Sequence, residues 1–178
     1  MRILAISGSL RSGSSNTLLL RAAMKLAPQN VEFTIYEGLG NLPHFSPELD
    51  GDDSPEAVQH FRGLLQAADG VIISTPEYAY GMPGSLKNAL DWTVASGEFV
   101  DKPVATISAS PNSLGGERAH ASLLLTLGAI SARVVEGGKL TVPFVRTKLN
   151  SDGEVSDVAT IEALEGVLGA LLQSIEIG

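Results

Sequence analysis

Apolar and polar positions recur along the chain with two different periods, and the two kinds of stretch follow one another in turn. Short apolar runs predict buried strands, and stretches with apolar residues every three or four positions predict helices. We expect strands over residues 2–7, 31–37, 69–75, 102–110 and 132–142. We expect helices over residues 15–27, 55–68, 84–96, 117–127 and 156–174. Residues 31–37 alternate apolar and polar positions, which is typical of a strand near the edge of a sheet. Strands that are otherwise apolar throughout, with a helix after each one, predict an α/β fold whose parallel sheet carries helices on both faces.

The residues between these stretches supply start and stop signals. Pro28 ends the first helix, and Ser54 is expected to cap the second, with Pro55 and Glu56 in its first turn. Residues 38–55 form a long loop rich in Gly, Pro and Asp, and loops of this length are often functional. Because no repeat or linker interrupts the pattern, we expect residues 1–178 to form one domain.

Composition narrows the function classes. The 178 residues are 44% hydrophobic and 18% charged with a net charge of −8, which is typical of a soluble globular protein. The acidic balance argues against nucleic acid as a partner, because phosphate backbones require a basic surface. The chain has no cysteine, which excludes disulfides, thiol catalysis and cysteine-ligated metals. Its three histidines are scattered without ligand spacing, so no metal site is expected.

Targeting and membrane signals are not expected either. The apolar stretch at the start of the chain is too short for the core of a signal peptide. No segment is expected to approach the roughly 20 apolar residues of a membrane helix. We therefore expect a cytoplasmic protein without a membrane partner.

In a parallel sheet of this kind, ligands bind at the carboxyl ends of the strands. The loop after the first strand reads GSLRSGSSNT (residues 8–17), and it matches neither a triphosphate-binding loop nor a dinucleotide fingerprint. Its hydroxyl, amide and guanidinium groups suit the free oxygens of a phosphomonoester. The alternative is an ordinary flexible loop before a capped helix. Composition alone leaves both interpretations open.

The loop after the third strand begins TPEYAYGMPGSLKNALDW (residues 75–92). Its prolines stiffen the chain, and its glycines allow backbone to approach a flat ligand. Tyr78 and Tyr80 offer aromatic surface, which suggests a planar heterocycle beside the phosphate. The two tyrosines could instead cap the core or fill a subunit contact. Leu86, Ala89 and Leu90 are expected to be core residues.

The two loops together resemble the NADPH-dependent FMN reductase family, a flavodoxin-like group that includes quinone, chromate and azo-dye reductases. The family patterns are G-S-x-R-x-x-S-x-N and P-E-Y-N-x-S-x-P-G-x-L-K-N-A-x-D-W. The first loop keeps Gly8, Ser9, Arg11 and Asn16, and the second keeps most positions from Pro76 to Trp92. Two positions depart from the pattern, since Ala79 replaces Asn and Gly81 replaces Ser.

The resemblance implies a flavodoxin-like three-layer sandwich with strand order 2-1-3-4-5. It implies an FMN phosphate held by Ser9, Arg11, Ser15, Asn16 and Thr17. It implies a flavin ring that lies along Pro76, Glu77, Tyr78, Ala79, Tyr80 and Gly81, with its other edge at Ser110, Gly115 and Gly116.

The resemblance also implies the activity. Hydride would pass from NADPH or NADH through FMN to a quinone or similar small acceptor by a ping-pong mechanism. No protein side chain need be catalytic, because the flavin carries the chemistry. Family members are commonly homodimers or homotetramers. The alternatives are a flavodoxin-type electron carrier, whose docking the acidic charge would suit, and a flavin-binding redox sensor. The second loop favours the reductase.

Overall fold

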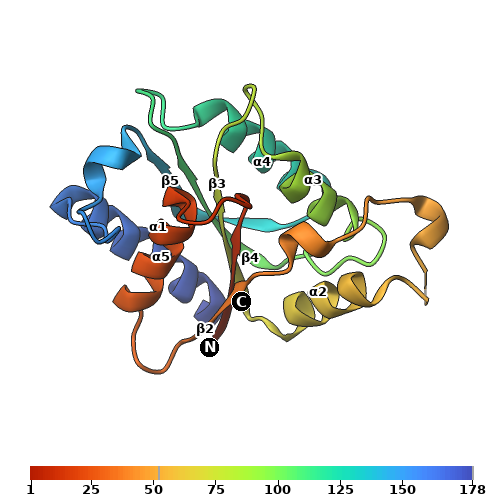
Figure 1. Ribbon diagram of the computed structural model, residues 1–178. Coiled ribbons are helices and arrows are strands. Elements are labelled where there is room, and N and C mark those ends of the chain that lie inside the picture. The colour runs from red at the N-terminus through yellow and green to blue at the C-terminus, as the bar shows by residue number, and fades with distance from the viewer. Residues whose placement is uncertain (52, 178) are drawn as a thin grey trace.

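A parallel sheet forms the centre of the computed structural model, which describes residues 1–51 and 53–177 (Figure 1). Five strands lie in the order β2-β1-β3-β4-β5, and every neighbouring pair is parallel. The strands are β1 (Arg2–Ser7), β2 (Glu32–Tyr36), β3 (Gly70–Thr75), β4 (Pro103–Ala109) and β5 (Arg133–Val142). The sheet and its strand order confirm the expected α/β architecture.

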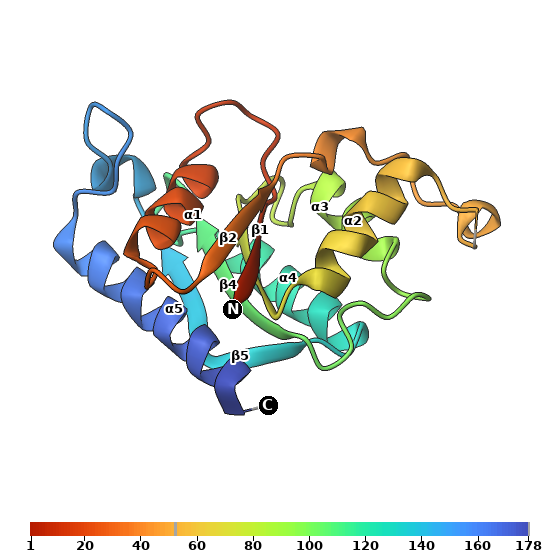
Figure 2. The same ribbon diagram turned by 90° about the horizontal axis from the view of Figure 1, so that it is seen from below.

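Five α-helices cover the two faces of the sheet. They are α1 (Ser15–Leu26), α2 (Glu56–Ala67), α3 (Gly84–Asp91), α4 (Glu117–Ala129) and α5 (Val158–Ile177). Figure 2 shows α1 and α5 on one side of the sheet and α2, α3 and α4 on the other. Three short 3-10 helices, η1 (Leu39–Asn41), η2 (Pro47–Leu49) and η3 (Val145–Lys148), lie in the connections.

Each face of the sheet has its own apolar core. In β1, Leu4 and Ile6 pack with α2, α3 and α4, whereas Ile3 and Ala5 pack with α1 and α5. Side chains of successive strand residues point to opposite faces, so a sheet covered on both faces requires strands that are apolar throughout. The expected core residues Leu86, Ala89 and Leu90 are fully buried.

The start of α2 and the end of α3 differ from expectation for reasons that the structure shows. Ser54 does not cap α2, because Pro55 takes the N-cap position and the buried Ser54 hydroxyl accepts a hydrogen bond from Arg62. The helix expected to reach residue 96 ends at Asp91. Beyond that point the Trp92 carbonyl accepts hydrogen bonds from the Arg62 guanidinium, and residues 92–96 form turns.

The long loop before α2 is tied to α3. It contains η1 and η2, so it is less irregular than its composition suggests. The Asn88 side chain and the Trp92 indole N–H both donate to the Pro43 carbonyl, at 2.9 Å each. The Phe45 N–H donates back to Asn88 Oδ1 at 2.8 Å. Two residues of the second motif therefore hold this loop in place.

Helix α5 is an exception to the expectation that no segment could span a membrane. By length and mean hydropathy of 1.4 it is apolar enough to do so. Yet Leu164, Val167 and Leu171 on its inner face are buried in the core beside β5. A helix that covers a sheet meets the same criteria of length and hydropathy, so this feature is weak evidence for a membrane span.

Candidate flavin site

The loops after β1, β3 and β4 converge at the carboxyl ends of their strands, as the topology requires. Together with the segment after β5 they enclose a cavity of about 290 Å³. Its lining residues are Ser9, Arg11, Ser14, Ser15, Asn16, Pro76, Glu77, Tyr78, Ala109, Ser110, Pro111, Val145 and Arg146. Eight of these residues follow three different strands, yet the sequence already assigned them to one site. They are Ser9, Arg11, Ser15, Asn16, Pro76, Glu77, Tyr78 and Ser110.

The first loop leaves hydrogen-bond donors open at the start of α1. Ser14 is the N-cap residue, and its side chain makes no capping hydrogen bond. The first N–H groups of a helix have no partner within the helix, and they carry the positive end of its dipole. The Arg11 N–H donates to Ser9 Oγ at 3.3 Å, which curls the loop around the helix start. This arrangement fits an anion with several free oxygens, such as a phosphomonoester.

Asn16 uses its side chain inside the protein. The side chain is buried, Nδ2 donates to the Ala109 carbonyl at 3.3 Å, and Oδ1 accepts from the Ser74 hydroxyl at 2.9 Å. It thereby joins α1 to β3 and β4. The Thr17 hydroxyl donates to Ser7 Oγ at 2.8 Å, and Thr17 lines a neighbouring hollow instead of the cavity. Because both side chains are hydrogen-bonded within the protein, Asn16 and Thr17 can bind a phosphate only through their backbone N–H groups.

The second loop makes a tight two-residue turn. Tyr78 and Gly81 exchange two backbone hydrogen bonds of 3.0 Å. The residues between them, Ala79 and Tyr80, have φ values of +48° and +64°. Positive φ at both central positions is the geometry of a type I′ turn, which Asn and Gly adopt most readily. The Asn of the family pattern therefore corresponds to a position where this chain holds an alanine in a left-handed conformation.

Glu77 fastens the second loop to α4. Its Oε2 accepts hydrogen bonds from the N–H groups of Arg118 and Ala119, at 3.0 and 3.1 Å. The Arg118 guanidinium in turn lies 4.1 Å above the Tyr80 ring. Tyr78 Oη approaches Ser9 Oγ at 3.5 Å, so the turn also touches the first loop. Tyr78 and Tyr80 remain 53% and 68% exposed, which leaves aromatic surface at the rim of the site.

Gly115 and Gly116 shape the third loop without lining the cavity. Both have positive φ, +60° and +87°. A Cβ at Gly115 would lie 2.7 Å from Thr141 Cγ2 and 2.8 Å from the backbone at the end of β5, so a larger residue would displace the strand end. Gly116 is the N-cap residue of α4, and a Cβ there would meet the Glu77 side chain at 3.6 Å. Their role is to bring α4 close to β4 and β5.

His120 lies behind the third loop in a buried polar cluster that the sequence did not reveal. Its ring nitrogens face Thr106 Oγ1 at 2.8 Å and Thr141 Oγ1 at 3.2 Å. Burial lowers the pKa of His120, and the charge of Lys139 lowers it further. The ring, neutral at pH 7, joins α4 to β4 and β5. A histidine with two threonine partners from other elements is a tertiary feature, and nothing in its local sequence marks it.

Arg146 is a charged lining residue that was not expected from the sequence. It lies in η3, after β5, and faces the same cavity as Arg11. The Val145 N–H donates to the Ser110 carbonyl at 3.1 Å, which brings this segment against the third loop. The sequence around Arg146 carries no motif, because its place in the site depends on the sheet order and on this long-range contact.

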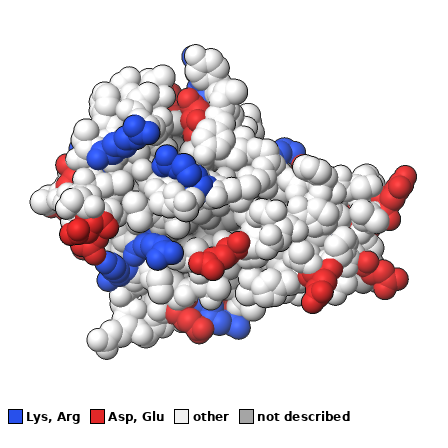
Figure 3. Space-filling model, in the orientation of Figure 1, with Lys and Arg blue, Asp and Glu red and all other residues white. Residues whose placement is uncertain are grey.

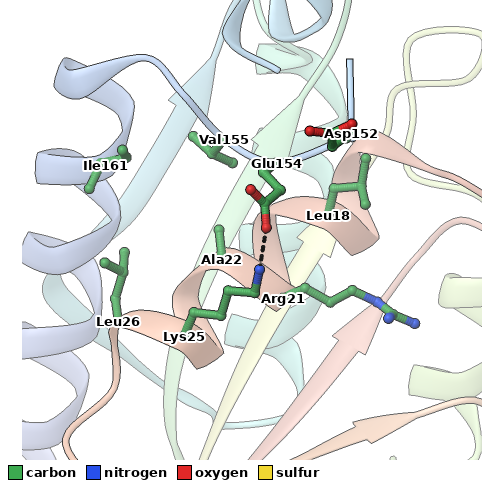
Figure 4. Close-up of a pocket in the computed structure, with 10 residues that line it drawn as sticks. Leu18, Arg21, Ala22, Lys25, Leu26, Asp152, Glu154, Val155 and Ile161 are labelled. Carbon is green, nitrogen blue, oxygen red and sulfur yellow. Dashed lines mark hydrogen bonds and ion pairs between the residues drawn. The ribbon is translucent and has the colours of Figure 1, made fainter. Parts of the chain in front are cut away.

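A separate hollow of about 380 Å³ lies along α1, between that helix and the segment before α5 (Figure 4). The Lys25 ammonium donates to Glu154 Oε1 at 2.5 Å across it, and Arg21 points away from this pair. The contact with Lys25 lowers the pKa of Glu154. The hollow contains none of the expected site residues, and the flavin assignment does not involve it.

Comparison with known proteins identifies the class that this fold and site define. The sequence model of the NADPH-dependent FMN reductase family matches residues 1–147. The chain belongs to this family. It is therefore an FMN-dependent oxidoreductase that takes electrons from NAD(P)H.

Individual relatives extend over almost the whole chain. An NAD(P)H-dependent FMN reductase of Pseudomonas aeruginosa is 32% identical, covering 96% of this chain and 93% of the relative. A quinone reductase of Escherichia coli is 30% identical, covering 99% and 98%. The structure of FerB, a flavoenzyme NAD(P)H:acceptor oxidoreductase from Paracoccus denitrificans, superposes with a TM-score of 0.88 at 31% identity, covering 99% and 97%. Flavodoxin 1 of Bacillus cereus shares the fold at 15% identity with a TM-score of 0.65, covering 97% and 98%.

Proposed function

We propose that this protein passes reducing equivalents from NADPH or NADH, through FMN, to a quinone or similar small acceptor. Donor and acceptor would use one open face of the site in turn. The observation that carries the proposal is the cavity, where open helix N–H groups and Arg11 adjoin a rigid aromatic turn. It is supported by the similarity to a quinone reductase of E. coli and to an NAD(P)H:acceptor oxidoreductase of P. denitrificans.

The first loop would hold the FMN phosphate. Ser9 and Ser15 offer hydroxyl groups, and Arg11 offers a fixed positive charge. Asn16 and Thr17 would contribute through the backbone N–H groups of the first helical turn, since their side chains are already bonded within the protein. Charge-assisted hydrogen bonds of this kind are about twice as strong as neutral ones.

The second and third loops would hold the flavin ring. Pro76, Glu77 and Tyr78 line the cavity, and the turn Ala79–Gly81 continues from them toward solvent. Ser110 would meet the other ring edge, with Gly115 and Gly116 setting the path of the backbone. FMN supplies the hydride chemistry when it is bound, so the protein needs no acid–base pair. The side chains orient the cofactor and leave one face accessible.

The open face follows from small residues at the turn. Ala79 and Gly81 replace the larger polar residues of the family pattern, and Ala79 is exposed. A flat nicotinamide or quinone requires space to stack, and short side chains provide it. An electron carrier would gain by covering the ring. The short side chains at Ala79 and Gly81 therefore favour a reductase with a small aromatic acceptor.

The proposal includes the assembly. Residues 1–178 would act as one flavodoxin-like unit in the cytoplasm and associate as a homodimer or homotetramer. Exposed apolar side chains beyond the site support self-association, among them Leu125 on α4, which is 78% exposed, and Val94 and Val100 after α3.

Binding and steady-state kinetics test the proposal together. FMN should bind much more tightly than riboflavin, because riboflavin lacks the phosphate. Initial rates with NADPH and a quinone should give parallel double-reciprocal lines. Equal affinity for both flavins would remove the phosphate assignment. Intersecting double-reciprocal lines would contradict the proposal that donor and acceptor use the same face in turn. Tight FMN binding without any NAD(P)H oxidation would favour the electron carrier or the redox sensor.

A further inference from the structure

Arg146 approaches the cavity from the side opposite to Arg11. Arg11 follows β1 and Arg146 follows β5, and in the sheet these strands flank β3 and β4. Both residues line the cavity of about 290 Å³. Figure 3 shows basic and acidic side chains side by side on the half of this face that holds α1 and α5, and acidic side chains alone at the far edge, around the loop before α2.

The segment that carries Arg146 is held in a defined position. Phe144, the N-cap residue of η3, has a φ of +50°, a left-handed conformation that costs energy for a residue with a side chain. Its N–H donates to the Asn112 carbonyl at 3.0 Å, and the Val145 N–H donates to the Ser110 carbonyl at 3.1 Å. Val145 is 1% exposed. The backbone beside Arg146 is therefore fixed against the third loop.

The two basic residues of η3 have different partners. Lys148 is paired with Asp157 at 3.0 Å, away from the cavity. The Arg146 guanidinium has no hydrogen bond or ion pair with any residue in the described part of the chain, and neither has the Arg11 guanidinium. Glu77, the one acidic residue of the lining, already accepts two N–H groups from α4. The lining thus carries two arginines and one carboxylate, so its charge is positive overall.

A phosphomonoester matches this charge. Its second pKa is about 6, so it carries a charge of roughly −1.5 to −2 at neutral pH. Arg11 alone would balance only part of that charge. We propose that Arg146 is a second phosphate-binding residue, which makes the site selective for the dianion of FMN. This inference rests on the proposed function, which puts the FMN phosphate in this cavity.

Equilibrium dialysis of the full-length chain against FMN and riboflavin at pH 7.5 tests the inference. R146A should weaken FMN binding roughly tenfold, the lower end for a hydrogen bond to a charged group, and leave riboflavin binding unchanged. R146K should restore part of the loss. K148A, on the same 3-10 helix, should bind FMN like the parent protein. Repeating the measurement at pH 5.5, where the phosphate is largely a monoanion, should shrink the effect of R146A.

Each contrary result has a distinct meaning. Equal loss of FMN and riboflavin in R146A would make Arg146 structural, and unchanged FMN binding would remove it from the phosphate site. Unchanged FMN binding with a lowered preference for NADPH over NADH would assign Arg146 to the electron donor instead, which also overturns the inference. If the parent protein itself fails to prefer FMN over riboflavin, the proposed function fails rather than the role of Arg146.

Discussion

Glu77 Oε2 accepts the backbone N–H of Arg118 at 3.0 Å, so the acidic residue of the second motif stabilises the start of α4. A carboxylate at this position satisfies two open N–H groups and complements the positive end of the helix dipole. The same contact fixes the loop that would carry the flavin ring. Motif residue and helix start therefore form one structural unit.

Replacing Glu77 by alanine should loosen both parts of that unit. We expect E77A to lower the free energy of unfolding of the flavin-free protein by about 1 kcal/mol, the typical value of a helix cap. FMN affinity should fall as well. E77Q keeps an acceptor and should lose less. E117A is the matched control, since Glu117 is exposed in the same helical turn and its side chain accepts no hydrogen bond from the described residues. Thermal unfolding of the three variants would contradict this account if E77A and E117A melt together.

The turn at Ala79 should be open to stabilisation. An alanine at φ +48° bears a cost of about 1–2 kcal/mol relative to a residue suited to the left-handed region. A79N and A79G should therefore raise the melting temperature of the flavin-free protein by about 2–4 °C per kcal/mol regained. A79V should lower it, because a branched side chain fits this conformation worst. Because the amide introduced by A79N would approach the open face, this variant should also change the rates with different quinones. If none of the three substitutions changes the melting temperature, the turn carries no strain.

Substitutions at two neighbouring residues of the first loop should have different effects, one on the stability of the protein and the other on FMN binding. The Asn16 side chain is buried and links α1 to β3 and β4. N16A should cost about 1–3 kcal/mol of stability, because it leaves the Ser74 hydroxyl without its acceptor. S15A should keep the stability and weaken FMN binding, since Ser15 lines the cavity and makes no side-chain hydrogen bond within the described residues. Calorimetric unfolding and FMN titration of both variants would refute these roles if their effects are reversed.

His120 should make stability depend on pH. Its pKa lies below the ordinary value of 6.5 because burial disfavours the charged ring and Lys139 repels it. As the pH falls below 6.5, His120 therefore binds a proton more readily in the unfolded chain than in the folded one. The contribution of the neutral His120 ring to the free energy of unfolding is complete above pH 6.5 and is lost as the pH falls. H120Q should show a smaller loss of melting temperature between pH 7.5 and 5.5 than the parent protein. H60Q, at an exposed histidine of α2, should behave like the parent. Parallel curves for H120Q and the parent would contradict the assignment.

The sequence predicts the features that depend on local pattern. Strands such as Gly70–Thr75 are buried throughout and mostly apolar, because helices cover both faces of the sheet, and this pattern can be read from the sequence alone. Loops that follow strands one, three and four necessarily meet in a parallel sheet, which explains why Ser9, Glu77 and Ser110 were assigned to one site.

Features that depend on a partner far along the chain could not be predicted in this way. Ser54 has the composition of a helix cap, but Arg62 takes its hydroxyl and Pro55 takes the cap position. Arg146 reaches the cavity through the contact of Val145 with Ser110, which no local pattern encodes. Long-range hydrogen bonds decide both cases.

Anaerobic stopped-flow absorbance of the FMN-loaded protein tests the central claim most directly. Mixing with NADPH or NADH, without any partner protein, should bleach the flavin absorbance within seconds. A second mixing with a quinone should restore it, because donor and acceptor use the same open face in turn. Flavin that remains oxidised with both nucleotides, yet is reduced when a separate reductase is added, would contradict the account and identify an electron carrier.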